Sequence, residues 1–81
     1  MSLNETEFNQ VDKHVGEQLR LLRCKARLSQ VQLSDKVGAK LPKIQEYESG
    51  QTRIGASRLF QFCKIFSVSP EFFFEGLNAD S

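Results

Sequence analysis

The sequence predicts a compact all-α fold of five short helices. Apolar residues recur at intervals of three and four, the spacing that places them on one face of a helix. Glycine, proline and capping residues interrupt this pattern at short intervals, and no alternating run is long enough for a strand. With 81 residues, 40% of them hydrophobic and 26% charged, the chain has the size and composition of one globular domain.

The first predicted helix runs from about residue 12 to residue 27. Its apolar positions form one stripe at helical spacing: Val15, Leu19, Leu22 and Ala26. Residues 1–11 show no apolar period, so we expect a flexible N-terminal segment there.

The second and third predicted helices are short and are joined by a glycine. The second begins after Ser29, whose hydroxyl can accept from the amide of Gln32 while the Gln32 side chain reaches back, and it ends at Gly38. The third spans about residues 41–49, with Pro42 tolerated in its first turn and a glycine directly after its end.

A fourth helix is predicted to begin at Gly55 or Ser57. Its buried stripe repeats at intervals of three and four: Leu59, Phe62, Cys63 and Phe66.

A fifth helix is predicted over about residues 70–75. Ser69 is the candidate cap, and Pro70 suits the first helical position because its missing N–H would have no helical partner there. The predicted domain therefore covers residues 12–77 and leaves residues 78–81 as a polar tail.

Several classes of function conflict with the composition. The longest uncharged stretch, residues 28–34, is far shorter than the ~20 apolar residues of a membrane span, and the polar start is unlike a signal peptide, so we expect a cytoplasmic protein. Cys24, Cys63 and the single His14 cannot complete a zinc site, and we interpret both cysteines as reduced core thiols. Without a phosphate loop or a catalytic Ser/His/Asp set, we expect no enzyme, no metal, no cofactor and no small-molecule substrate.

The net charge is only +1, but basic residues are concentrated in the first predicted helix. They are Lys13, Arg20, Arg23, Lys25 and Arg27. A phosphate-facing surface and an ordinary solvated helix face would both produce this pattern, so charge alone does not separate them.

Two short helices joined by a tight glycine turn form a helix-turn-helix unit, whose second helix can enter the major groove of DNA. Ser34 is the small residue needed where the two helices cross, and Ile44 and Tyr47 supply apolar contacts. A helical hairpin without DNA-binding activity would satisfy the same packing rules, so packing alone leaves both interpretations open.

Several separated motifs lie in register along residues 12–77. They are Leu22-Arg23, Leu28-Ser29-Gln30-Val31-Gln32-Leu33, Val37-Gly38, Ile44-Gln45-Glu46-Tyr47-Glu48-Ser49-Gly50, Gly55-Ala56-Ser57-Arg58-Leu59-Phe60 and Phe72-Phe73-Phe74-Glu75-Gly76. This set resembles the phage repressor/Cro-type helix-turn-helix regulators, also called the xenobiotic-response-element family. The resemblance implies a repressor-like five-helix domain that binds double-stranded DNA and regulates transcription in a bacterium or phage.

The resemblance also implies which residues of the third helix read the bases. Since Ile44 and Tyr47 face inward, their neighbours face outward. The implied base contacts are Leu41, Pro42, Gln45 and Glu46. A glutamine amide can read adenine, a carboxylate can accept from cytosine, and an apolar side chain can lie against a thymine methyl group.

The implied phosphate contacts surround that helix: Gln30, Lys40, Lys43, Ser49 and Arg53. Gln30 could instead assist the cap of the second helix. Lys40 stands where the family has a Ser or Thr cap and cannot accept a hydrogen bond from the helix amides. Arg23 and Glu48 match a structural salt bridge of the family, which would fix the angle of the third helix.

The family dimerises with two-fold symmetry, so the resemblance implies a homodimer on a palindromic operator. The implied interface is the aromatic C-terminal region: Phe60, Pro70, Phe72, Phe73 and Phe74. Most of the phenylalanines belong to the core, but three consecutive rings cannot all face inward. An alternative function is a protein-interaction module of the same fold, an antitoxin or accessory subunit, that holds its partner through this aromatic surface.

Overall fold

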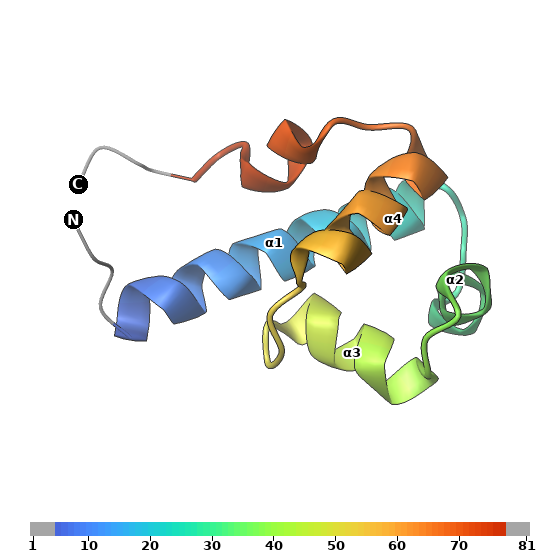
Figure 1. Cartoon of the computed structure of the whole chain (residues 1–81), viewed down its shortest axis with the longest axis horizontal. Coiled ribbons are helices and arrows are strands. Elements are labelled where there is room, and N and C mark those ends of the chain that lie inside the picture. The colour runs from blue at the N-terminus through green and yellow to red at the C-terminus, as the bar shows by residue number, and fades with distance from the viewer. Residues whose placement is uncertain (1–4, 78–81) are drawn as a thin grey trace.

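The all-α prediction is confirmed by the computed structural model, which describes the backbone of residues 5–77 and the side chains of residues 10–77. This part of the chain forms four α-helices, one 3-10 helix and no strand (Figure 1). The elements are α1 (Glu5–Lys25), α2 (Gln30–Val37), α3 (Leu41–Ser49), α4 (Ala56–Phe66) and the 3-10 helix η1 (Pro70–Phe74).

The prediction of five α-helices is wrong, because the last element is a 3-10 helix. Its amides bond to carbonyls three residues earlier, as in the 3.1 Å bond from Phe72 N to Ser69 O and the 3.3 Å bond from Glu75 N to Phe72 O. A segment of five residues is too short to nucleate an α-helix, whereas 3-10 helices are usually this short. Pro70 stands in the first turn as predicted, but the side chain of Ser69 makes no capping bond.

The first helix begins at Glu5 rather than near residue 12, so residues 5–11 of the expected flexible segment are helical. Val11 packs against the core and Asp12 forms an ion pair with Arg53, which anchors the helix before its predicted start. The division of the chain at residues 11 and 77 stays a prediction, and residues 78–81 lie outside the described part.

At its other end, α1 stops before Ala26. This residue is exposed, so its predicted place in the apolar stripe is wrong. Arg27 takes the left-handed conformation with φ 59°, and Leu28 N then bonds to Arg23 O at 3.1 Å. This backbone arrangement closes a helix at its C-terminus by satisfying carbonyls that have no helical partner.

The core lies along α1, which runs through the middle of the molecule with α3 on one side and η1 on the other (Figure 1). Ten apolar residues are buried in it: Val15, Leu19, Leu22, Leu33, Val37, Ile44, Tyr47, Phe62, Cys63 and Phe73. Tyr47 and Phe62 meet edge to face with their ring centroids 6.0 Å apart, which joins α3 to α4.

The α1 and α3 backbones approach closely at Gly16. A Cβ atom there would strike the carbonyl oxygen of Tyr47 and lie 2.9 Å from that of Glu48. Gly50, at the end of α3, lies equally close to α1, because its Cβ would come within 2.8 Å of the Cα atom of Lys13. A larger residue at either position would therefore force α1 and α3 apart.

The two thiols differ in environment. Cys63 is buried in α4, where burial raises the pKa of its thiol. Cys24 is exposed, so its prediction as a core thiol is wrong. It follows Leu22 and Arg23 on α1 and falls on the solvent side of the helix.

Within residues 5–77 no helix combines the length and the apolar character required to cross a bilayer. The same residues hold no group of three or more His, Cys, Asp or Glu side chains placed to bind a metal ion.

Candidate nucleic-acid interface

The helix-turn-helix unit consists of α2, the turn at Gly38 and α3. Ser29 Oγ accepts from Gln32 N at 3.0 Å and Gln32 Oε1 accepts from Ser29 N at 2.8 Å, which is the predicted reciprocal cap. Gly38 has φ 73° and its N–H bonds to Ser34 O at 2.9 Å. The local signals of the sequence therefore specify this turn, and the predicted ends of both helices are confirmed.

The start of α3 has no side-chain cap. Lys40 stands at the N-cap and makes no capping bond, as its lack of an acceptor predicts, while Pro42 lies in the first turn. The backbone amide of Lys43 instead bonds to Lys40 O at 3.0 Å. The first turn of α3 is thus closed by backbone contacts, and the Lys40 ammonium group is left exposed.

The two faces of α3 differ as predicted. Ile44 and Tyr47 are buried against α1 and α4, whereas Pro42 and Gln45 are exposed. Leu41 and Glu46, the other predicted base contacts, are half-buried.

Glu46 is already engaged within the chain. Its Oε1 atom accepts from Thr52 Oγ1 at 2.9 Å and lies 3.7 Å from Lys43 Nζ. Gln45, by contrast, makes no side-chain hydrogen bond to a described residue. Gln45 is therefore the polar side chain of this face that is most available to a base edge.

A polar network joins α1, α2 and α3. Arg23 Nε donates to Glu48 Oε2 at 2.6 Å and Arg23 Nη2 donates to Glu48 Oε1 at 3.1 Å, so the salt bridge that the resemblance implied is present and bidentate. The two side chains are only 13% and 5% exposed. The hydrogen bonding that Arg23 donates to Glu48 raises the pKa of Arg23 above its usual value, because it favours the charged guanidinium.

Gln30 belongs to the same network. Its Nε2 atom donates to Glu48 Oε1 at 3.0 Å, so it does not assist the cap of α2. An amide nitrogen carries two hydrogens, and the second stays available at the N-terminal end of α2, where a phosphate would also meet backbone N–H groups.

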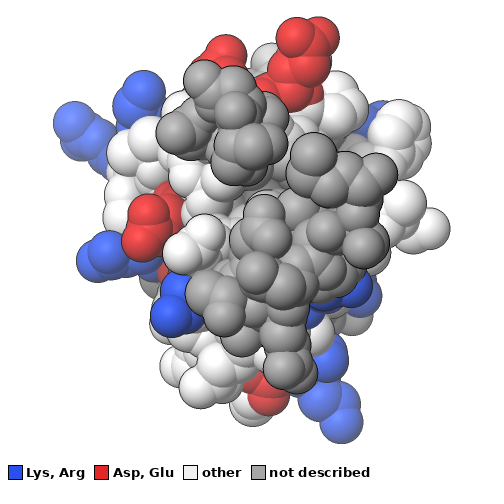
Figure 2. All heavy atoms as spheres, turned by 90° about the vertical axis from the view of Figure 1, so that its left-hand side faces the viewer, with Lys and Arg blue, Asp and Glu red and all other residues white. Residues whose placement is uncertain are grey.

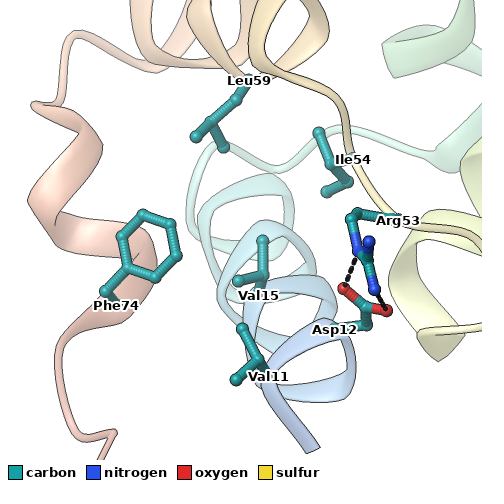
Figure 3. Close-up of a pocket in the computed structure, with 7 residues that line it drawn as sticks. All are labelled: Val11, Asp12, Val15, Arg53, Ile54, Leu59 and Phe74. Carbon is teal, nitrogen blue, oxygen red and sulfur yellow. Dashed lines mark hydrogen bonds and ion pairs between the residues drawn. The ribbon is translucent and has the colours of Figure 1, made fainter. Parts of the chain in front are cut away.

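Arg53, a predicted phosphate contact, forms an ion pair with α1. Its Nε and Nη2 atoms lie 3.2 Å and 3.5 Å from the two carboxylate oxygens of Asp12. The pair borders a mostly apolar hollow of about 260 Å³, into which Ile54, Leu59 and Phe74 project (Figure 3). The Arg53 side chain is 61% exposed, so a phosphate can approach it in competition with Asp12.

The predicted interface residues separate into three groups. Phe60 and Phe74 are 62% and 44% exposed, Pro70 is exposed, and Phe72 is half-buried. Phe73 is fully buried, so its assignment to an interface is wrong. Its ring fills the core beside α1, whereas the neighbouring Phe74 lies partly exposed at the apolar hollow next to Leu59.

Arg58 was absent from the predicted contacts. Its Nη1 atom donates to Val37 O at 2.9 Å and to Gln61 Oε1 at 3.0 Å, which brings a cation from α4 to the end of α2. The sequence places Arg58 at the start of the fourth helix but does not show that this start lies beside the helix-turn-helix turn.

At the end of the molecule that lies on the left in Figure 1, basic and acidic side chains are mixed. Figure 2 shows blue side chains around the rim of this end with red side chains between them. Beside α3, by contrast, three basic residues line one cleft: Lys40, Lys43 and Arg58.

Comparison with known protein families agrees with this geometry. The model of the family described as a helix-turn-helix domain matches residues 14–71, most of the chain. The match includes α2, α3 and the whole of α4.

Several proteins similar to this chain are described as transcriptional regulators. A protein of Sinorhizobium medicae described as an uncharacterized HTH-type transcriptional regulator is 40% identical over 77 residues, which are 95% of this chain and 55% of that protein. One from Sinorhizobium fredii is 42% identical over 67 residues, 83% of this chain and 47% of its own length. An uncharacterized transcriptional regulator in the ATPase CF(0) region of Rhodospirillum rubrum is 39% identical over 71 residues, 88% of this chain and 66% of that protein. The chain spans about half the length of the two Sinorhizobium proteins.

Proposed function

The chain belongs to the helix-turn-helix domain family, and from that membership we propose that it is a sequence-specific DNA-binding regulator of transcription. In this proposal α3 enters the major groove and reads base edges with Gln45, Pro42 and Leu41. Glu46 reads a base only after it exchanges its hydrogen bond with Thr52 for one with the base. The phosphates on either side are held by Gln30, Lys40, Lys43 and Arg53, and by Ser49 through its backbone.

The observation that carries the proposal is the contrast between the two faces of α3. One face is fixed by Ile44, Tyr47 and the buried Arg23 to Glu48 ion pair. The other face presents the uncommitted Gln45 amide beside Pro42. A helix that is fixed on one side and exposed on the other is suited to insertion into a groove, because its orientation is already set and binding costs little conformational entropy.

We further propose that two copies bind a palindromic operator as a homodimer. Phe60 and Phe74 are exposed on α4 and η1, and Pro70 is exposed at the start of η1. Large exposed rings mark contact surfaces, and an isologous contact would present two α3 helices about 34 Å apart, one helical turn of DNA.

The decisive experiment is selection of the purified protein against a random duplex library at two salt concentrations, followed by sequencing. We expect an enriched inverted repeat whose retention weakens as salt rises, because phosphate contacts release counterions. Retention without an enriched motif would contradict sequence-specific binding. No retention at all would favour the protein-interaction alternative, an antitoxin or accessory subunit that uses the exposed rings of Phe60 and Phe74.

The reading face is tested by the double variant Gln45→Ala, Glu46→Ala. We expect base preference at the corresponding positions to relax by roughly 1–3 kcal/mol per lost contact. The matched control is Gln10→Ala, an exposed glutamine of α1 outside the helix-turn-helix unit, which should leave the preference unchanged. An unaltered preference in the double variant would refute this assignment of the bases to α3.

A further inference from the structure

A cleft of about 370 Å³ opens where α2, α3 and α4 meet. The turn after α2 forms one wall, the beginning of α3 contributes Lys40, Pro42 and Lys43, and α4 contributes Arg58. Glu46 is the one acidic residue that lines it. The cleft therefore gathers three cations and a single carboxylate next to the face of α3 that carries Gln45.

Arg58 is held in place and still has donors to give. Both of its hydrogen bonds, to Val37 O and to Gln61 Oε1, use the Nη1 atom. The Nε and Nη2 groups donate to no described residue. A guanidinium that is fixed by one nitrogen and unengaged at the other two presents the planar fork that suits a phosphate.

The acid in the cleft does not cancel this positive charge. Oε1 of Glu46 accepts from Thr52 Oγ1 at 2.9 Å, which draws the carboxylate toward the loop after α3. Its ion pair with Lys43 spans 3.7 Å between side chains that are 45% and 41% exposed, and such exposed pairs contribute little. The Lys43 ammonium can therefore leave Glu46 for a stronger anion.

We propose that this cleft seats one phosphate of the DNA backbone, held jointly by Arg58, Lys43 and Lys40. The proposal rests on the DNA-binding function above and adds to it a phosphate-contacting residue from α4, outside the helix-turn-helix unit. Because Arg58 is bonded to the last carbonyl of α2, the phosphate would be tied to both helices of the unit at once. The bound phosphate would thereby fix the position of Pro42 and Gln45 in the major groove.

The test measures how binding to one duplex carrying the enriched motif depends on salt, for R58Q, K43Q and the double variant. Each neutralised phosphate contributes about 0.9 to the slope of log K against log salt. We expect each single variant to lower the slope, and the double variant to lower it by no more than about 0.9 in total, because both cations serve one phosphate. Loss of a merely structural bond would weaken binding without changing the slope.

Two matched variants complete the test. R58K keeps the charge and should keep most of the slope, whereas R20Q removes an exposed arginine from the solvent side of α1 and should leave the slope at the wild-type value. Should R58Q fail to fold, as thermal unfolding would reveal, K40Q and K43Q offer the same comparison with two exposed side chains.

The outcomes separate the two proposals. A wild-type slope in R58Q, or in K40Q and K43Q if R58Q does not fold, overturns the phosphate cleft while DNA binding stands. A double variant whose loss of slope reaches about 1.8 also overturns it, because the cations would then serve separate phosphates. Failure of the wild-type protein to bind any duplex removes the DNA-binding function itself.

Discussion

The two flanks of α1 are built in different ways. On the α3 flank, the helix backbones approach so closely at Gly16 that no larger residue fits, and the Arg23 to Glu48 ion pair closes the contact. On the η1 flank, the fully buried ring of Phe73 fills the space between the elements. Gln18 Nε2 donates to Phe72 O at 2.9 Å, and His14 Nε2 lies 2.6 Å from Glu75 O.

This difference separates orientation from volume. Backbone contact and a bidentate ion pair are directional, so the α3 flank fixes the angle at which the proposed reading helix stands. Burial of a ring is non-directional and stabilises in proportion to the apolar area removed from water, so Phe73 mainly supplies stability. The two polar contacts of the η1 flank, at Gln18 and His14, orient η1 and do not involve α3. Changes on the first flank should therefore disturb DNA binding, and changes on the second should lower the free energy of unfolding.

The largest expected effect is that of Phe73→Ala on the η1 flank. Removing a fully buried ring should lower the free energy of unfolding by about 3–5 kcal/mol, measured by urea denaturation. Phe74→Ala, one position further along and 44% exposed, is the control and should cost less than about 1 kcal/mol. Equal losses in the two variants would show that Phe73 does not carry the packing of this flank.

Gly16→Ala should come next, on the α3 flank. The added methyl group would meet the carbonyl oxygens of Tyr47 and Glu48, so α1 and α3 must separate. We expect the free energy of unfolding to fall by about 3 kcal/mol and DNA affinity to fall more than it does in Phe73→Ala. Gly55→Ser is the matched control, since a Cβ atom there meets nothing within 4 Å and serine suits the N-cap of α4. Normal stability and affinity in Gly16→Ala would break the distinction between the flanks.

Glu48→Ala should lower the free energy of unfolding by about 2–3 kcal/mol, because it leaves Arg23 partly buried without its anion. It also releases Gln30 from Glu48, so we expect DNA affinity to fall by more than the lost stability alone explains once the variant is fully folded. Glu17→Ala, an exposed acid on α1, should change neither quantity by more than about 0.5 kcal/mol. An unchanged affinity in folded Glu48→Ala would assign the ion pair to stability only.

The smallest effect is expected at the thiols. Cys63→Ser buries a hydroxyl in α4 and should cost about 1 kcal/mol, whereas Cys24→Ser should be neutral. Labelling of the native protein should modify Cys24 rapidly and Cys63 slowly, because burial both shields the Cys63 thiol and raises its pKa, which lowers its thiolate fraction. Equal labelling rates would mean that α4 opens readily from the core.

Local patterns were reliable where a few neighbouring residues decide the conformation. The reciprocal cap of Ser29 and Gln32, the left-handed turn at Gly38 and the uncapped start of α3 at Lys40 all follow from side-chain chemistry within one turn. The inward orientation of Ile44 and Tyr47 follows equally from helical spacing.

Predictions failed where distant residues decide the outcome. Val11, one residue before the predicted start of α1, packs against the core, and Asp12 meets Arg53, which follows 41 residues later in the chain. The choice of Phe73 rather than Phe74 for the core depends on the 3-10 geometry of η1, which changes the direction of each ring relative to an α-helix.

The sequence by itself therefore determined the helical class, the helix-turn-helix unit and the outward face of α3, because capping and periodicity act between near neighbours. Only the tertiary structure decided which polar groups on and around that face stay uncommitted. Glu46 and Gln30 are engaged by Thr52 and Glu48, and Arg58 reaches the end of α2 from another helix. Such pairings depend on how the helices pack, and spacing along a single chain does not encode the distance between side chains on different elements.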